Sequence, residues 1–351
     1  MNSETKKSTL IALGEFFNDT LLYYKDNDHI PKNKELKNEI AIAAELVEVV
    51  HSENGWFTKD SVLAVYQAWA NALEHDKVER WLSHYDLESN KNTKVGVIMA
   101  GNLPLVGLHD ALSVIISGNV LHAKVSSKDR SLMMFVLKVI QKLIPNPEQV
   151  QLVERLNDVD CLIATGSDNS ARYFDYYFKD KKRIIRKNRT SIAVLIGDES
   201  EEELNGLSHD IFRHFGLGCR NVTKLYLPQG YNLDDVFKAL FHYQEIANHN
   251  KYANNYDYNK AVYLLNKIEL IENGFLLMKE DEGIHSPVGV LFYEFYDTIE
   301  EVKSIIEDRK DELQCVVSNA ALPQRVPFGA AQSPELWDYA DGVDTIEFLL
   351  N

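Results

Sequence analysis

The sequence has few cysteines, and their arrangement excludes the sites that cysteines usually build. Three are present: Cys161, Cys219 and Cys315. Their odd number and wide spacing argue against a disulfide framework and against a zinc site, so we expect no metal. Unpaired cysteines, together with an N-terminus that lacks an apolar and cleavable leader, predict a cytoplasmic protein.

Positive charge is also scarce. Lysine and arginine number 37 against 53 aspartates and glutamates, which gives a formal net charge of −16. A nucleic-acid binder normally carries a basic surface, and an acidic surface repels anionic lipids. We therefore expect no nucleic-acid partner, and any anionic ligand must be held by local positive groups.

Long hydrophobic runs are missing as well. The stretch most similar to a membrane span is residues 95–123, where His109, Asp110 and His122 are the only ionisable groups. Glycines and a proline interrupt it, and Asp110 would lie in the middle of the bilayer at a high cost in free energy. The pattern is typical of a strand, a turn, a helix and a second strand, so we expect no membrane span.

The sequence does contain a regular alternation of helical and strand patterns. Residues 1–90 show apolar stripes of helical period. After the polar segment 88–94, short apolar runs alternate with helical patterns, which predicts a parallel sheet covered on both faces. Strands are expected at 95–100, 119–125, 160–166 and 191–197, and helices at 105–116, 130–144 (with Asp129 as N-cap), 170–178 and 233–247.

Cys219 is a candidate nucleophile. It lies in the segment FGLGCRNVTKLYLP at residues 215–228, where glycines let a substrate approach the backbone closely. A reactive thiolate needs an accessible and positive environment. Three groups that can carry positive charge are close in sequence: Arg213, His214 and Arg220. The alternative is a small buried apolar residue, the usual fate of a free cysteine. The other two cysteines lie in apolar strand patterns that suit a core.

Three further segments place polar groups where predicted strands end. Asn102 follows the first strand, where its amide could donate to a developing oxyanion or serve as a helix N-cap. Lys124 ends the second strand, at the edge where parallel sheets bind cofactors, although it could be a plain surface lysine. The Gly-Ser turn in residues 164–174 could present backbone N–H groups to a phosphate, or it could be an ordinary turn with a helix cap.

The order of these segments resembles the aldehyde dehydrogenase superfamily. Six segments of the chain match family motifs in the family's order. Residues 100–104 match the asparagine turn, residues 117–127 match the ribose-binding K-P-S-E segment, and residues 164–167 match the F-T-G-S turn. Residues 216–219 match the nucleophile loop, residues 284–288 match the I-F-G-P-V segment, and residues 327–330 match the closing P-F-G-G. The motifs are individually degenerate, but six in the correct order are specific.

The resemblance implies an α/β fold with a parallel-sheet cofactor domain, an α/β catalytic domain and a helical N-terminal segment. The expected divisions are 1–90 (helical), 91–190 (nucleotide-binding), 191–326 (catalytic) and 327–351 (C-terminal, with a strand-like end). The implied site residues are Cys219 as nucleophile, Asn102 as oxyanion donor, and Lys124, Ser126, Ser127, Gly166 and Ser167 around the cofactor.

Two positions depart from the family motifs, and the first of them indicates which reaction of the family to expect. Hydrolytic members carry a glutamate that activates water in L-E-L-G-G-K, whereas residues 183–190 read RIIRKNRT, without a carboxylate. This pattern is similar to the acyl-CoA reductase branch, related to the fatty-acid reductase subunit of bacterial bioluminescence. The glutamate that usually precedes I-F-G-P-V is replaced by Gly283, with Glu282 one residue earlier.

The resemblance implies reduction of an acyl-CoA, or of an acylated protein, to a fatty aldehyde through an acyl-cysteine. NADPH is expected, with NADH possible, because Ser127 replaces the K-P-S-E glutamate. His214 and His209 are candidate bases for Cys219. We also expect a homo-oligomer and an acyl-donating synthetase partner. Two alternatives stay open: a CoA-acylating semialdehyde dehydrogenase, and a catalytically silent relative that holds an acyl group.

Overall fold

The computed structural model describes residues 1–88, 91–166 and 168–351. The chain forms two compact units. Unit 1 comprises Met1–Lys187 together with Glu335–Asn351, and unit 2 comprises Asn188–Pro334. None of the helices in the described ranges is long and apolar enough to cross a membrane.

Unit 1 is built on a parallel sheet, sheet A, with the strand order β3-β2-β1-β4-β5. Its central strands are buried along most of their length because helices cover both faces, as the apolar runs predicted. The order reverses direction between β1 and β4, which in open α/β sheets marks the ligand-binding edge. The strands are β1 (Lys94–Ile98), β2 (Val120–Lys124), β3 (Val150–Leu152), β4 (Cys161–Thr165) and β5 (Lys182–Arg186).

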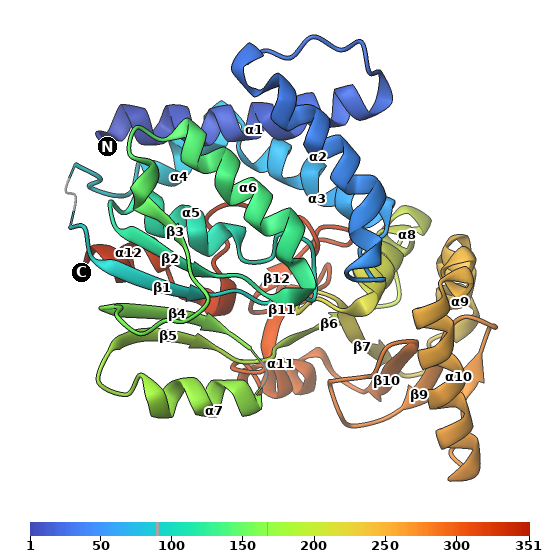
Figure 1. Ribbon diagram of the computed structural model, residues 1–351. Coiled ribbons are helices and arrows are strands. Elements are labelled where there is room, and N and C mark those ends of the chain that lie inside the picture. Colours follow the sequence, from blue (N-terminus) through green and yellow to red (C-terminus); the bar gives the residue numbers. More distant parts are fainter. Residues whose placement is uncertain (89–90, 167) are drawn as a thin grey trace. The chain divides into compact units, whose positions relative to one another are not determined.

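The helices of unit 1 form two layers on one face of sheet A and a single helix on the other. In Figure 1, α5 and α6 lie next to the sheet, the N-terminal helices lie over them, and α7 covers the opposite face. The helices are α1 (Ser3–Lys25), α2 (Lys37–Val49), α3 (Lys59–Ala72), α4 (His75–Leu82), α5 (Leu108–Ile116), α6 (Arg130–Leu143), α7 (Asp168–Tyr177) and α12 (Thr345–Leu350).

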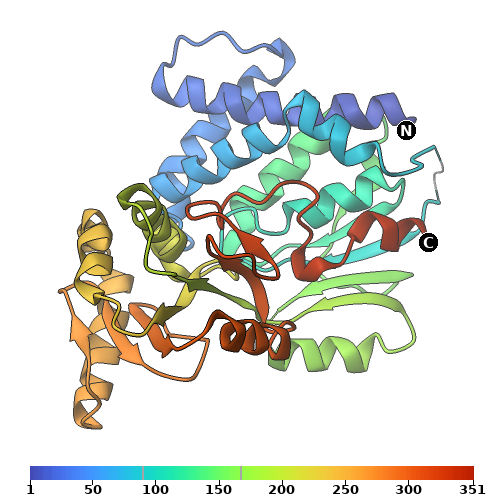
Figure 2. The same cartoon turned by 180° about the vertical axis from the view of Figure 1, so that it is seen from behind.

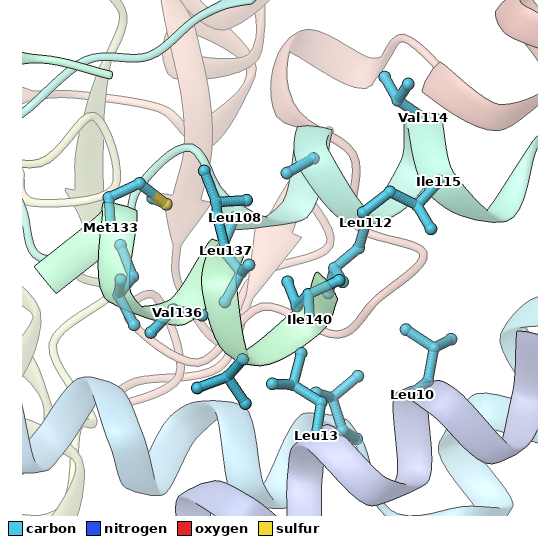
Figure 3. Packing of buried hydrophobic residues seen from close by; sticks show 14 of the residues in the cluster. Leu10, Leu13, Leu108, Leu112, Val114, Ile115, Met133, Val136, Leu137 and Ile140 are labelled. Carbon is cyan, nitrogen blue, oxygen red and sulfur yellow. The ribbon is translucent and has the colours of Figure 1, made fainter. Parts of the chain in front are cut away.

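The N-terminal helices share one hydrophobic core with the sheet and its covering helices. Leu10 and Leu13 of α1 point toward Ile140 of α6 and Leu112 of α5 (Figure 3), and all four side chains are almost fully buried. Each such side chain stabilises the fold by about 1.5–3 kcal/mol relative to exposure. The helical segment is therefore an integral layer of unit 1.

Unit 2 contains sheet B, with the strand order β12-β11-β6-β7-β10-β9-β8, in which only the β8–β9 pair is antiparallel among the described pairs. Its strands are β6 (Thr190–Val194), β7 (Val222–Pro228), β8 (Ile271–Glu272), β9 (Leu277–Glu280), β10 (Val290–Tyr296), β11 (Leu313–Val317) and β12 (Arg325–Val326). Its helices are α8 (Glu201–Phe212), α9 (Leu233–Leu240), α10 (Asn250–Leu265) and α11 (Ile299–Asp308).

The strand-like end expected for the chain is wrong, because residues 345–350 form the helix α12. The side chain of Asp344 accepts a hydrogen bond from the backbone N–H of Glu347, which caps the helix and outweighs the β-branched residues at its start. Figure 2 shows this chain end returning to unit 1, where α12 contacts α5.

Two other expectations need correction. Asp129 precedes α6 but makes no capping bond with its side chain; the carboxylate instead accepts from the backbone N–H of Leu105. The predicted helix 233–247 is α9 followed by a stretch of 3-10 helix at Phe241–Asn248. Apolar spacing alone does not separate these two kinds of helix.

Arg186 and Asp110 form a buried ion pair in unit 1, and we expect the stability of the protein to depend on it. Arg186 Nη1 donates to Asp110, and Nη2 donates to Thr345 Oγ1 at 2.9 Å. We expect Asp110→Ala to lower the free energy of unfolding by about 3–5 kcal/mol, because the guanidinium would lose its buried counter-ion.

The matched control is Asp158→Ala, which removes the exposed ion pair with Lys94 and should change the stability little, because solvent screens an exposed pair. Urea unfolding followed by tryptophan fluorescence measures both, since Trp56, Trp69, Trp81 and Trp337 all belong to unit 1. Equal losses in the two variants would contradict the assigned role of the buried pair.

Candidate functional site

Three strands of unit 1 bring the predicted cofactor residues to one edge of sheet A. Ile98 of β1 lies beside Lys124 of β2 on one side and Ala164 of β4 on the other. Asn102 follows β1 by four residues and Gly166 follows β4 directly, so both leave the same carboxyl edge as Lys124. The structure thus brings these predicted residues together at the edge where parallel sheets bind ligands.

Asn102 is exposed in the loop between β1 and α5. The N-cap of α5 is Gly107, so the alternative in which Asn102 caps that helix is wrong. Leu105 in the same loop has a φ of 55°, a left-handed conformation that is costly for a residue with a branched side chain. Its N–H donates to Asp129 Oδ2 at 2.8 Å, which stabilises the turn.

The loop after β2 carries the residues expected to contact the ribose. Lys124 is exposed at the strand end, and its backbone carbonyl accepts from Met99 N at 3.1 Å. Ser126 accepts from the N–H of Lys128 at 3.3 Å and so caps the short 3-10 turn Ser127–Asp129. Ser127 is exposed, so its hydroxyl is accessible to a ligand.

The turn after β4 has the expected strand–turn–helix form. Gly166 follows the strand, and α7 begins at Asp168. A Cβ on Gly166 would lie 2.9 Å from Ser170 Cβ, so the tight turn requires glycine. Ser167, the other residue predicted here, lies outside the described residues.

These features fit a nicotinamide dinucleotide. An exposed lysine, two serines and a glycine turn at the start of a helix can hold phosphate and ribose groups through charge-assisted and backbone hydrogen bonds. All of the residues that would hold the dinucleotide belong to unit 1.

Cys219 lies in unit 2, in the loop between the 3-10 turn Arg213–Gly216 and β7. It is exposed, whereas Cys161 and Cys315 are buried, so the alternative of a buried Cys219 is wrong. Burial raises the pKa of the Cys161 thiol to about 11, which makes that thiol a poor nucleophile at neutral pH. Exposure therefore singles out Cys219 as the accessible thiol.

A buried asparagine holds the Cys219 loop. Asn221 Nδ2 donates to the carbonyls of Asp210, Ile211 and Arg213 at 2.8–3.2 Å, and Asn221 Oδ1 accepts from Gly218 N at 2.8 Å. On the other side, Ser191 Oγ donates to the Cys219 carbonyl at 3.0 Å. The loop that carries Cys219 is thus held by hydrogen bonds to Asn221 and Ser191.

The segment before this loop is strained. His214 and Phe215 have φ values of 54° and 61°, so two non-glycine residues in succession are left-handed. Each costs of the order of 1 kcal/mol and persists only where surrounding contacts hold it. Such strain concentrates at functional sites, which is consistent with a role for the loop that follows.

The expected positive environment of Cys219 is only partly present. Burial lowers the pKa of His214 to about 4, so this imidazole is neutral at pH 7. Its Nδ1 atom is buried and has no hydrogen-bond partner in the part of the chain that the structure describes. His209 Nδ1 lies 2.6 Å from Tyr243 Oη. Their roles as bases stay predictions.

Sequence reasoning missed Asp210, a fully buried carboxylate of unit 2. It accepts from the N–H groups of Gly329 and Ala331 at 2.7 and 3.0 Å, and so holds the segment expected to match the closing P-F-G-G motif. Burial raises its pKa to about 7. The sequence around Asp210 does not indicate these contacts, because the partners are backbone groups more than a hundred residues away in the chain.

A cavity of about 700 Å³ in unit 2 is separate from the Cys219 loop. Its lining includes Glu199, Glu201, Asp235 and Tyr231, which follow the carboxyl ends of β6 and β7. Cys219 precedes the amino end of β7, so the two features lie at opposite ends of that strand. The charged residues of the lining are three carboxylates and one lysine, Lys238, a balance that does not favour an anionic ligand.

Comparison with solved structures identifies the fold. Aldehyde dehydrogenase 21 from Physcomitrella patens, in complex with succinate, matches with a TM-score of 0.67 and 13% identity over 100% of this chain and 84% of that one. An aldehyde dehydrogenase from Mycobacterium tuberculosis complexed with NAD+ matches with a TM-score of 0.59 and 13% identity over 88% and 73% of the two chains.

The chain has the fold of the aldehyde dehydrogenases. A putative aldehyde dehydrogenase from Burkholderia cenocepacia agrees, with a TM-score of 0.63 and 11% identity over 91% and 74% of the two chains. No family model and no curated protein matches the sequence. The expected α/β fold, similar to that of the aldehyde dehydrogenases, is confirmed, whereas the acyl-CoA reductase branch stays a prediction.

The buried carboxyl group of Asp129 should make the stability of unit 1 depend on pH. Burial raises the pKa of its carboxyl group to about 8, so the folded state binds a proton that the unfolded state releases above about pH 4. The carboxyl group of Asp129 therefore raises the free energy of unfolding below about pH 4, and this added stability is lost as the pH rises to about 8.

Asp129→Asn should remove this dependence, because the amide oxygen can still accept from Leu105 N and carries no charge. We expect the variant to lose less stability than the wild type between pH 5 and pH 8.5. Urea unfolding followed by tryptophan fluorescence measures it, and identical pH slopes in the two proteins would refute the assignment.

Proposed function

We propose that this protein reduces an acyl-CoA to an aldehyde through an acyl-cysteine on Cys219, using NADPH. The observation that carries the proposal is an exposed cysteine on a loop held by Asn221 and Ser191, in an aldehyde dehydrogenase fold. The lack of a water-activating carboxylate in residues 183–190 supports the reductive direction.

The chemistry begins with the thiolate of Cys219. It attacks the thioester carbonyl, the bond between that carbon and the CoA sulfur breaks, and CoA leaves as a thiol after taking up a proton. The Cys219 backbone N–H would stabilise the oxyanion by about 3–4 kcal/mol, and the family resemblance implies the same role for the amide of Asn102. Bound NADPH would supply the hydride that reduces the acyl carbon. Cleavage of the bond to Cys219 then releases the aldehyde and restores the thiolate.

The end of β5 supports a long-lived acyl-enzyme. Where hydrolytic relatives carry their glutamate, this chain has Ile185 and Arg186. Arg186 is engaged with Asp110 and Thr345 in the core of unit 1. Neither side chain can act as a general base toward water, so we infer slow hydrolysis of the thioester.

The loop after β2 supports NADPH over NADH. A carboxylate at the ribose accepts bonds from its hydroxyls and repels a 2′-phosphate. Here that position is Ser127, which is uncharged and exposed, and Lys124 and Lys128 are also exposed. Two lysines and a hydroxyl can bind a phosphate through charge-assisted hydrogen bonds.

The activity test measures NADPH oxidation and aldehyde formation against acyl-CoA substrates of increasing chain length. We expect turnover with wild type, at least a thousandfold loss in Cys219→Ala, and most of the activity in the control Cys315→Ser, whose thiol is buried. A wild type that is acylated without turnover would favour an acyl-holding role, and an active Cys219→Ala would exclude the covalent route.

The cofactor test compares kcat/KM for NADPH and NADH in wild type and Ser127→Glu. We expect wild type to favour NADPH by about tenfold or more, equivalent to about 1.4 kcal/mol, and Ser127→Glu to reverse or abolish the preference. If the ratio is unchanged by the substitution, Ser127 does not face the ribose.

A further inference from the structure

The turn Glu53–Trp56, between the 3-10 turn Val50–Ser52 and α3, reaches both loops of the candidate site in unit 1. Asn54 at its centre is 5% exposed. Its Nδ2 donates to the carbonyl of Gly101 at 3.2 Å and to the carbonyl of Lys128 at 3.3 Å. One amide group therefore bridges the loop that carries Asn102 and the loop that carries the expected ribose contacts.

The bridging amide is held in a defined orientation. Asn54 Oδ1 accepts from the N–H of Trp56 at 3.2 Å, and the Asn54 carbonyl accepts from Phe57 N at 2.8 Å. These bonds fix which end of the amide is the donor, since Oδ1 is already used as an acceptor. The neighbouring Glu53 accepts from Ser131 N at 3.2 Å, so the turn is also fixed to α6.

The two loops are in contact where Asn54 joins them. A Cβ on Gly101 would lie 2.5 Å from Ser126 Oγ and 3.0 Å from Lys128 Cβ. Only glycine leaves enough room at this contact, so the positions of the two loops depend on each other.

Asn102 lies between two buried anchors. On its N-terminal side, Asn54 holds the carbonyl of Gly101; on its C-terminal side, Asp129 holds the N–H of the left-handed Leu105. Asp129 also ends the 3-10 turn that follows Ser126. Both anchors connect the loop of Asn102 to the loop after β2.

We propose that Asn54 is a positioning residue that sets the oxyanion loop and the cofactor loop together. The roles of the two loops rest on the proposed function. The N-terminal helical layer would then contribute to the site as well as to the core, through this one turn. Loss of the amide donor should loosen both loops and weaken cofactor binding.

The test uses Asn54→Asp, which keeps the shape and the acceptor for Trp56 N but removes both donors. The matched control is Thr58→Ala, which removes the N-cap of α3 beside the same turn, where the Thr58 hydroxyl accepts from Ser61 N within that helix. Two readouts are compared with wild type: hydrogen exchange of the peptides covering residues 99–106 and 124–131, and the Kd for NADP+.

We expect Asn54→Asp to exchange faster in both peptides and to bind NADP+ about tenfold more weakly, as loss of one or two hydrogen bonds predicts. Thr58→Ala should match wild type in both readouts. If Asn54→Asp behaves like Thr58→Ala, the proposal is overturned. A wild type that does not bind NADP+ would refute the proposed cofactor, while the exchange comparison would still decide the role of Asn54.

Gly101→Ala provides a second variant in case Asn54→Asp does not fold. Its methyl group would lie 2.5 Å from Ser126 Oγ, so it changes the contact between the two loops while the side chain of residue 54 stays an asparagine. Faster exchange in both peptides would support coupling of the loops, and an effect confined to residues 99–106 would contradict it.

Discussion

The structure depends on buried side-chain amides and carboxylates that satisfy the backbone of irregular loops. Asn54 and Asp129 do this in unit 1, and Asn221 and Asp210 do it in unit 2. A loop cannot satisfy its own polar groups as a helix or strand does, and a buried unpaired group costs about 1–3 kcal/mol. These four side chains therefore hold irregular backbone at the expected oxyanion, nucleophile and closing segments.

This arrangement explains how a chain only 11–13% identical to the aldehyde dehydrogenases compared with it can keep their fold. Sheets and helices need only the right apolar pattern, which many sequences provide. The loops need particular polar groups at particular places. Under the proposed function, the exposed cysteine loop and the asparagine loop would serve acyl transfer, and the absence of a carboxylate in residues 183–190 would favour reduction of the acyl-enzyme over its hydrolysis.

Much of the fold could be predicted from sequence, because buried parallel strands are short apolar runs. β1, β2, β4 and β6 were expected within a few residues. β5 was missed, since its residues KRIIR are mostly charged, and α10 was missed because its tyrosines and asparagines form no apolar stripe. Cys219 and Asn102 could be found from local glycine and strand-end patterns. Asn54 and Asp210 could not, since their partners are backbone groups distant in sequence.

A single-turnover chase tests reduction through an acyl-cysteine on Cys219 most directly. The protein is incubated with a long-chain acyl-CoA without reductant, freed of unbound acyl-CoA by desalting, and then mixed with NADPH. We expect an acyl group on Cys219 that survives desalting and is released as aldehyde in an amount equal to the adduct. Release as free fatty acid, or an adduct that NADPH does not discharge, would contradict it.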